Sequence, residues 1–169
     1  EIAPDFFKEK ILATGHSPDD EKRICVGMIF LPRTDYSKQE KCREIIESAL
    51  LEENYNIYGW RQVPINPSVL GETADHNRPE IAQVMFKKNE NLETNDLERD
   101  LFETRKKIEK VARQSQLDEL YICSFSSRSI VYKGMFLAEM LSEFYPDLND
   151  EKLTSRFAVF HQRYSTNTF

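Results

Sequence analysis

The first thirty residues show two different hydrophobic patterns, and each predicts a regular element. Phe7 and Ile11 lie four positions apart within residues 5–12, which favours a short helix. Residues 24–31 form a continuous apolar run that ends at Pro32, a pattern typical of a strand buried on both faces. The start of the chain therefore predicts a helix, a polar loop and a buried strand.

The next part of the chain predicts a helix and two strands. Ser37 and Glu40 match a capping box, and apolar residues follow at helical spacing. Residues 55–64 alternate in character and predict a strand, while 64–79 is rich in proline and polar residues and predicts a long connection. Residues 81–86 predict the next strand. The apolar face of the helix comprises Cys42, Ile45, Ile46, Ala49 and Leu50.

The second half of the chain predicts one long helix, three strands and a short helix. Acidic residues crowd the first turns of 96–116 and basic residues follow, the charge order that favours a helix dipole. Strands at 120–125 and 129–135 are separated by three residues, the spacing of a hairpin. A short helix over 137–145 ends at a proline, and 156–163 predicts the last strand.

The order of these elements predicts a fold class. Residues 24–125 give strand, helix, strand, strand, helix, strand, which is the split βαβ pattern of ferredoxin-like folds. The class is α+β with a largely antiparallel sheet. A chain of 169 residues fits one domain and can bury roughly two thirds of its unfolded surface.

Composition and charge exclude two classes of function. Hydrophobic residues make up 40% of the chain, and no stretch approaches the roughly 20 apolar residues of a membrane-spanning helix. The net charge is −6 and the pI is near 5.2, with lysines and arginines scattered among acids. Binding of nucleic acid without sequence preference needs a clustered basic face. We therefore expect neither a membrane nor a nucleic acid as partner.

Cysteine and histidine positions predict neither a disulfide framework nor a zinc site. Cys25, Cys42 and Cys123 are odd in number and irregularly spaced, so we expect reduced thiols that line the core. Cys25 invites interpretation as a nucleophile, but its apolar neighbours offer no charge that would activate the thiol. No Cys-x-x-Cys pair is present, and the histidines are widely separated. They are His16, His76 and His161.

Polar side chains gather around Arg163, directly after the apolar residues 157–160. Its guanidinium is a planar fork that matches a carboxylate, and Ser165, Thr166 and Asn167 supply hydroxyl and amide groups for the same ligand. An arginine paired with an acid at a strand end, followed by ordinary turn residues, explains the same pattern. The residues alone leave both interpretations open.

Lys133 and His161 are weaker candidates. Lys133 precedes Gly134 at the end of a predicted strand, where a lysine serves catalysis or phosphate binding in some proteins. A solvated strand end is the commoner explanation. His161 has no second histidine or carboxylate at ligand spacing, so we expect hydrogen bonding rather than metal binding or proton transfer.

Five stretches of the sequence are distinctive when taken in order: VGMIFLPR (26–33), GWRQVPINPSVLGETA (59–74), ARQSQLDELYICSFSSRSIVYKGM (112–135), FYPDL (144–148) and HQRYSTNTF (161–169). Together they resemble the class II glutamine amidotransferase domain of glutamate synthase large chains. The likeness extends from about residue 24 to the last residue, and the opening EIAPDFFKE is similar too. The combination of SSRSIVYKGM with HQRYSTNTF is specific rather than a generic pattern.

The resemblance implies an N-terminal-nucleophile enzyme with a four-layer αββα core. In that family an N-terminal cysteine attacks the carboxamide of glutamine, with its own α-amino group as base, and the thioester is hydrolysed. Ammonia then travels to a second site, where 2-oxoglutarate becomes 2-iminoglutarate. Reduction on FMN gives glutamate, with electrons that come through an iron–sulfur cluster from NADPH or ferredoxin.

Carried over to this sequence, the resemblance assigns a binding role to three residues. Arg163 would bind the α-carboxylate of L-glutamine, and Thr166 and Asn167 would line the pocket beside it. The family's Cys-Gly start would lie upstream of Glu1, which cannot act as the nucleophile, and the Asn-Gly oxyanion hole downstream of Phe169.

These positions make residues 1–169 a single partial domain with no catalytic residue of its own. We therefore expect the isolated chain to be inactive, to hold no cofactor, and to work with the rest of a glutamate synthase chain. That chain would be cytoplasmic, or plastidic in a plant-type ferredoxin enzyme.

Two other interpretations remain. The split βαβ pattern of 24–125 also suits a ferredoxin-like binding or regulatory module without catalysis. Alternatively, the segment serves as scaffold or interdomain surface in the parent enzyme. The predicted function is thus a piece of a glutaminase domain, weighed against these two.

Overall fold

A four-stranded sheet with helices on both faces forms the centre of the computed structural model, which describes residues 1–18 and 23–161. The strands are β1 (Cys25–Leu31), β2 (Tyr55–Gln62), β3 (Glu80–Lys88) and β4 (Tyr121–Ser126). The helices are α1 (Pro4–Ala13), α2 (Tyr36–Glu52), α3 (Glu72–Asn77), α4 (Thr94–Gln114) and α5 (Leu141–Phe144). Short 3-10 helices span Pro67–Val69, Ala138–Met140 and Pro146–Asn149.

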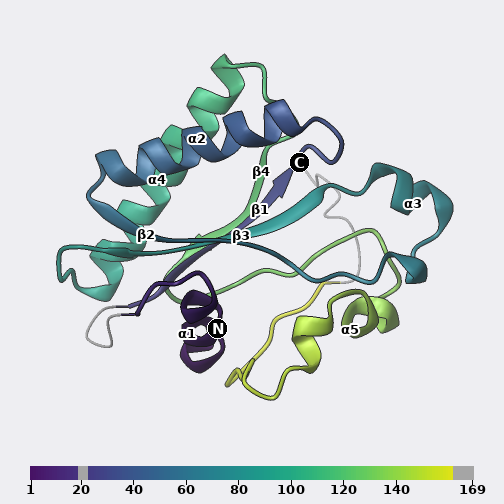
Figure 1. The fold of residues 1–169 in the computed structure, drawn as a ribbon. Coiled ribbons are helices and arrows are strands. Elements are labelled where there is room, and N and C mark those ends of the chain that lie inside the picture. Colours follow the sequence, from purple (N-terminus) through teal and green to yellow (C-terminus); the bar gives the residue numbers. More distant parts are fainter. Residues whose placement is uncertain (19–22, 162–169) are drawn as a thin grey trace, which may run out of the picture.

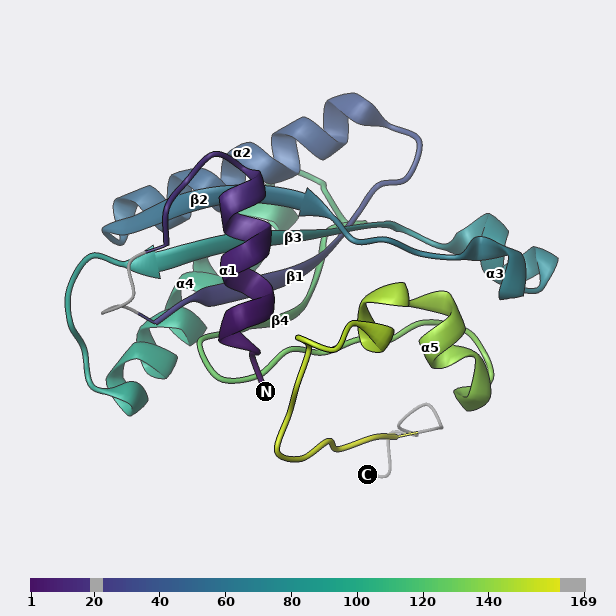
Figure 2. The ribbon, with the colours of Figure 1, turned by 60° about the horizontal axis from the view of Figure 1, so that its bottom comes forward.

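The sheet has the order β2-β3-β1-β4, and every neighbouring pair is antiparallel. β1 and β2 therefore run in the same direction with β3 between them, which is the split βαβ arrangement predicted for residues 24–125. Helices α2 and α4 cover one face of the sheet, and α1 and α5 lie on the opposite face (Figures 1 and 2). The prediction of a mixed fold with an antiparallel sheet is confirmed.

Strand β1 is buried on both faces, as its apolar sequence predicts. Cys25, Ile29 and Leu31 face the core under α2 and α4. The alternate residues Val26 and Met28 face α1 and α5. Because side chains alternate along a strand, only an apolar residue at nearly every position can fill both layers. β1 is thus the strand that joins the two cores.

The face of the sheet opposite α2 and α4 is covered by aromatic residues. Phe6 and Phe7 of α1 are fully buried against Val26 and neighbouring strand residues. Phe144 and Tyr145, at the end of α5, pack on Met28. Their rings meet edge to face with centroids 4.7 Å apart, a favourable aromatic geometry.

A bulge in β2 explains why residue 59 is a glycine, and it also holds the end of α1 against the sheet. The pairing of β2 with β3 shifts between Ile57 and Gly59, and Gly59 has a φ of 136°, which L side chains rarely adopt. Tyr58 lies within the bulge, and its carbonyl accepts a hydrogen bond of 2.8 Å from the Thr14 hydroxyl. The bulge therefore ties β2 to the residue that follows α1.

The start of α2 differs from the predicted capping box. The helix begins at Tyr36, and the carboxylate of Asp35 accepts the backbone N–H of Lys38 at 3.0 Å. Ser37 consequently lies inside the first turn rather than at the cap. An aspartate two residues earlier offers the same kind of acceptor, so the sequence contained two possible caps.

The predicted hairpin does not form, because residues 129–135 are not a strand. Serine hydroxyls accept backbone N–H groups of the predicted strand: Ser124 accepts from Val131 at 3.1 Å, and Ser126 accepts from Ser129 at 3.1 Å. Side-chain acceptors of this kind compete with strand pairing. The segment still follows β4, but without a ladder.

Two further expectations about regular structure are wrong. The connection 64–79 contains a 3-10 helix and α3 rather than loop alone. The described part of the predicted last strand, residues 156–161, has no strand. Its side chains are also not buried, since Val159 is 89% and Phe160 is 88% exposed. No strand of the described chain forms hydrogen bonds with this segment, so its apolar pattern does not lead to a strand.

Candidate functional site

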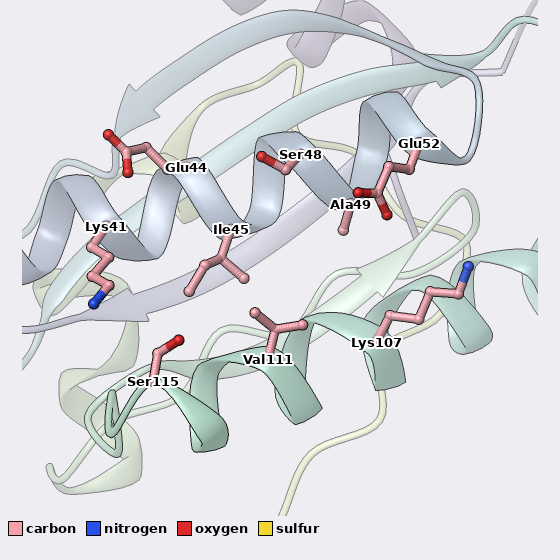
Figure 3. Close-up of a pocket in the computed structure, with 9 residues that line it drawn as sticks. All are labelled: Lys41, Glu44, Ile45, Ser48, Ala49, Glu52, Lys107, Val111 and Ser115. Carbon is pink, nitrogen blue, oxygen red and sulfur yellow. The ribbon is translucent and has the colours of Figure 1, made fainter.

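A shallow groove of about 310 Å³ lies between α2 and α4 (Figure 3). Ile45 and Val111 point toward each other across it, and Lys41, Glu44 and Glu52 stand along its rim. The charges are mixed in sign and open to solvent, which is typical of a helix surface. The groove also lies on the other side of the sheet from the polar cluster that follows.

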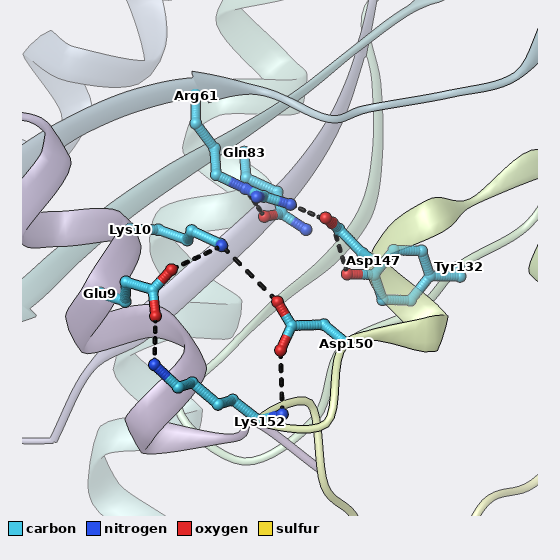
Figure 4. Close-up of polar contacts among 8 residues, drawn as sticks. All are labelled: Glu9, Lys10, Arg61, Gln83, Tyr132, Asp147, Asp150 and Lys152. Atoms are coloured by element: carbon cyan, nitrogen blue, oxygen red, sulfur yellow. Dashed lines mark hydrogen bonds and ion pairs between the residues drawn. The ribbon is translucent and has the colours of Figure 1, made fainter.

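Residues from three of the five quoted stretches meet in a buried polar cluster on the α1 and α5 side of the sheet (Figure 4). Arg61 comes from β2, Tyr132 from the segment after β4, and Asp147 from the 3-10 helix Pro146–Asn149. Gln83 of β3 completes the group, which we call the Arg61 cluster. The fold thus brings together residues far apart in the chain.

Arg61 is the centre of this cluster. Its Nε donates a hydrogen bond of 2.6 Å to Oε1 of Gln83, its cross-strand partner. Its guanidinium also forms an ion pair with Asp147 and lies 5.2 Å from the ring centre of Phe6. The side chains of Arg61 and Asp147 are only 12% and 6% exposed. Removal of one member of such a pair leaves a buried charge without compensation.

Tyr132 adds a neutral donor to the same carboxylate. Its hydroxyl donates to Oδ2 of Asp147 at 3.2 Å. Burial, and then the negative charge of Asp147, raise the pKa of Tyr132 well above the ordinary value, so the hydroxyl keeps its proton. The ring packs edge to face on Tyr145, whose own hydroxyl donates to the carbonyl of Lys133 at 2.8 Å.

A second, more exposed set of charges joins α1 to the residues after Asp147 (Figure 4). Lys10 lies 3.8 Å from the carboxylate of Asp150, and Lys152 lies 2.5 Å from that of Glu9. Hydrogen bonds from Lys152 and Lys10 lower the pKa of Glu9. The Lys10–Asp150 pair is partly exposed and the Lys152–Glu9 pair is largely exposed, so each contributes little energy. Both pairs hold the residues after Asp147 against α1.

The turn after β4 is fixed by Glu98 of α4. One carboxylate oxygen accepts both the backbone N–H and the hydroxyl of Ser127, at 2.8 and 2.7 Å. The other accepts the hydroxyl of Ser126 at 2.8 Å. A charged acceptor with three donors makes strong hydrogen bonds. The SSRS sequence (126–129) therefore forms a turn that is held by hydrogen bonds to Glu98, and Arg128 at its tip is exposed.

The three thiols are free, as predicted, and none is activated. Burial, followed by the nearby charge of Glu98, raises the pKa of Cys25 far above its ordinary value. Burial also raises the pKa of Cys42 to about 11 and that of Cys123 to about 12. Only thiolates attack carbonyl carbons, so none of these residues serves as a nucleophile at neutral pH.

Lys133 is exposed, which fits a solvated position rather than a buried site. Its ammonium donates to the hydroxyl of Tyr121 at 2.8 Å and lies 4.2 Å from the centre of that ring. His161 is exposed as well. Within residues 1–18 and 23–161 there is no group of three or more His, Cys, Asp or Glu that could hold a metal ion. In the same ranges no helix is long and apolar enough to cross a bilayer.

Arg163, Thr166 and Asn167 lie outside the described residues. The roles assigned to them therefore stay predictions. The Arg61 cluster and Glu98 were not among the predicted site residues. A signal was present, since Arg61 and Asp147 both lie in quoted stretches, but a single charge beside a turn or within an alternating strand does not reveal its partner.

The comparisons with known proteins define the class of this chain. The family model of the class-II glutamine amidotransferases matches residues 1–169. The chain therefore belongs to the class-II glutamine amidotransferases.

Within this class, the relatives are glutamate synthases. The large chain of glutamate synthase [NADPH] from Azospirillum brasilense is 51% identical over 164 residues, which is 97% of this chain and 11% of that protein. The chloroplastic ferredoxin-dependent glutamate synthase of Oryza sativa subsp. japonica is 42% identical over 165 residues. The Arabidopsis thaliana ferredoxin-dependent glutamate synthase 1 is 44% identical over the same length. The chain spans about a tenth of the length of these relatives (11%, 10% and 10%).

Proposed function

We propose that residues 1–169 form part of the glutaminase domain of a glutamate synthase, an enzyme that makes glutamate from glutamine and 2-oxoglutarate. The observation that carries the proposal is the match of the class-II family model over residues 1–169. It is supported by the 51% identity to a glutamate synthase large chain across 97% of the sequence. Hydrolysis of glutamine would supply the ammonia for the second reaction.

The nucleophile would come from another part of the parent chain. A class-II amidotransferase attacks the carboxamide with an N-terminal cysteine, and the three thiols here have raised pKa values. Cys25 in particular lies inside β1 with no exposed surface. We therefore propose that the isolated 169-residue chain releases no ammonia from glutamine.

Arg163 would bind the α-carboxylate of glutamine, and Thr166 and Asn167 would line the pocket beside it. The support is chemical, because the planar fork of a guanidinium pairs with a carboxylate through two hydrogen bonds. The hydroxyl and amide side chains that follow are suited to the polar groups of an amino acid.

The parent domain would have the four-layer αββα arrangement. In that fold a second sheet packs on the first, and the described chain leaves apolar side chains without cover. Phe157, Val159 and Phe160 are 64%, 89% and 88% exposed. Burial of side chains of this size stabilises a protein by about 1.5 to 3 kcal/mol each. Residues 1–169 would then be one part of a larger single domain.

FMN and an iron–sulfur cluster would bind elsewhere in the parent chain, where electrons from NADPH or ferredoxin reduce the imine. The thiols of this chain do not gather as cluster ligands would. Cys25 and Cys42 belong to the core under α2 and α4, whereas Cys123 packs on the other side of the sheet. One relative is named for NADPH and another for ferredoxin. The parent chain would be cytoplasmic, or plastidic if it is a plant-type ferredoxin enzyme.

The test uses the full-length parent protein with Arg163→Ala. We expect a rise of roughly a hundredfold in KM for glutamine, because the bidentate pair that Arg163 would form with the carboxylate is lost. Activity with ammonia in place of glutamine should be unchanged, since ammonia bypasses this pocket. Arg156→Ala is the matched control, because Arg156 is exposed in the same segment. An unchanged glutamine KM would show that the segment is scaffold rather than binding site.

A ferredoxin-like binding module is the second candidate, favoured by the sheet order β2-β3-β1-β4. Such a module would have no contact with glutamine, so Arg163→Ala in the full-length protein would leave the KM for glutamine unchanged. A raised KM in that variant excludes the module.

A further inference from the structure

The groove between α2 and α4 carries apolar side chains in its middle and charges along its rim (Figure 3). Ile45 and Val111 face each other across it, and the small residues Ser48 and Ala49 lie beside them on α2. Val111 is 42% exposed. Small residues let another helix approach closely, because the distance between packed helices depends on the side chains at the contact. The groove therefore has the shape of a site for a second helix.

Three charged side chains of α2 at this groove lack a partner in the described part of the chain. Lys41, Glu44 and Glu52 form no side-chain hydrogen bond or ion pair with any residue of 1–18 or 23–161. Lys107 on the opposite rim differs, because it forms an ion pair with Glu53. Glu52 is also the last residue of α2, where a negative charge is unfavourable for the helix dipole. A positive charge from another molecule would stabilise this end of the helix.

The spacing of these side chains makes α2 complementary to a second copy of itself. Lys41 and Glu52 are eleven positions apart in the sequence, which is about three turns and about 17 Å along one side of a helix. Ile45 comes four positions after Lys41, and Ser48 comes four positions before Glu52. An antiparallel copy, related by a two-fold axis at the middle of this run, would place each Lys41 opposite a Glu52. The same axis would place Ile45 opposite Ser48, so that a large side chain meets a small one.

We infer that the α2–α4 groove is a contact between two copies of this protein, in which the two α2 helices pack antiparallel. A second copy suits the groove better than an unrelated helix, because a two-fold rotation brings its positive end onto its negative end. Lys41 of each copy then supplies the positive charge that the C-terminal end of the other α2 lacks. The contact lies on the other side of the sheet from the Arg61 cluster and is independent of the proposed function.

This contact would be of modest strength. Its two Lys41–Glu52 pairs are near the surface, where ion pairs contribute little energy. Its apolar part consists mainly of Ile45 and Val111 from each copy. We expect a dimer with a dissociation constant on the order of micromolar, as for other small interfaces.

Sedimentation equilibrium of the full-length protein measures this dissociation constant. Lys41→Glu should raise it at least about tenfold, because two attractive pairs become two repulsive ones. Glu52→Lys should raise it as much for the same reason. The double variant Lys41→Glu with Glu52→Lys restores opposite charges across the axis, so its dissociation constant should return to within about threefold of wild type.

Glu40→Lys is the matched control for these charge changes. Glu40 lies on the same helix, its side chain is 74% exposed, and it does not line the groove. The substitution makes the same change of charge as Glu52→Lys. We expect the dissociation constant to change less than about twofold, since exposed charges outside a contact have weak effects.

Disulfide trapping tests the register of the two helices directly. In Lys41→Cys with Glu52→Cys, the new thiols are about 17 Å apart within one chain, which is too far for a disulfide, but they meet across the two-fold axis. Oxidation with diamide should give a covalent dimer on a non-reducing gel, at least about fivefold more than in wild type or in either single variant. Glu40→Cys with Glu52→Cys is the control and should stay at the wild-type level.

Absence of the covalent dimer in the cysteine pair would overturn the inference, whatever else holds the parent protein together. Wild-type protein that stays monomeric at about 100 μM would overturn it as well. So would a micromolar dimer that responds equally to Lys41→Glu and Glu40→Lys, or a charge swap without recovery. If another part of the parent chain covers the groove, no covalent dimer forms. Should a charge variant fail to fold, the cysteine pair decides.

Discussion

Glu98 and Ser127 are joined by two hydrogen bonds to one carboxylate oxygen, from the serine N–H at 2.8 Å and from its hydroxyl at 2.7 Å. They connect helix α4 to the turn after β4, where backbone N–H groups would otherwise lack partners. The turn is therefore specified by a residue that lies on a different element.

Glu98→Gln should destabilise the protein by about 1 to 2 kcal/mol, because an amide loses the charge that strengthens these bonds and one of the acceptor oxygens. Urea unfolding at neutral pH measures the change. Glu103→Gln is the control on the same helix, where the side chain is exposed and a change below about 0.5 kcal/mol is expected. Equal effects of the two substitutions would contradict the role of Glu98.

Gly27→Ala should destabilise the protein by about 1 to 3 kcal/mol through overpacking. A methyl group at this position would lie 2.8 Å from Cγ1 of Val84 and 2.9 Å from Cδ2 of Phe125. The measurement is the shift of the urea midpoint. Gly71→Ala meets no atom within 4 Å and should leave the midpoint nearly unchanged. If Gly27→Ala left the urea midpoint unchanged, β1 and β4 would have to be able to move apart.

The thiols should resist alkylation by iodoacetamide in the folded protein at neutral pH. Cys42 and Cys123 have pKa values raised to about 11 and about 12, so the reactive thiolate is a minute fraction, and Cys25 is fully buried. Mass spectrometry should detect no rapid modification in native buffer and three modified cysteines in denaturant. The native rate should rise about tenfold per pH unit, because thiolate grows in that proportion below the pKa. Fast labelling of one thiol at pH 7 would refute this.

Glu109→Gln should reduce stability at pH 7 by about 0.5 to 1 kcal/mol and have little effect at low pH. Burial alone would raise the pKa of Glu109, but hydrogen bonds from Lys106 and Arg105 outweigh it and hold the pKa below its ordinary value of 4.5. A carboxyl group whose pKa is lowered by folding stabilises the folded state at any pH above its ordinary pKa. This contribution is lost as the pH falls through the lowered pKa. Urea unfolding at pH 7 and pH 3 measures it. A difference that grows on acidification would show that the sign is wrong.

The sequence predicts the central sheet well because its signals are local. The apolar run of β1 reflects a strand buried on both faces, and the stripe of α4 has the helical period. The alternation in β2 locates the strand, although the bulge at Gly59 shifts which of its side chains share a face. The split βαβ order follows once these elements are assigned. Local pattern and tertiary environment agree in this part of the chain.

The segments after β4 were predicted less well because their structure depends on partners far away in the sequence. Residues 129–135 have the composition of a strand, yet the hydroxyls of Ser124 and Ser126 accept the backbone N–H groups of Val131 and Ser129. Residues 157–160 are apolar but exposed. A pattern of side chains shows that a segment suits burial and does not show what covers it.

The candidate site shows the same limit. The sequence contains Arg61 and Asp147 as two isolated charges, and only the packing of α5 and the following 3-10 helix on the sheet joins them. Three cysteines, in contrast, were assigned correctly from their apolar neighbours alone. An inert thiol can be predicted from its own apolar neighbours in the sequence. A buried ion pair can be predicted only when both of its members are known to meet.

The position of β1 between β3 and β4 has a consequence for synthesis on the ribosome. β1 is the most apolar strand and is synthesised before both of its partners, since β3 begins at Glu80 and β4 only at Tyr121. Both edges of this strand therefore stay unpaired until β3 has emerged, and one edge stays unpaired until β4 has emerged, a state prone to aggregation. Slower translation before β4 would lengthen the time at risk.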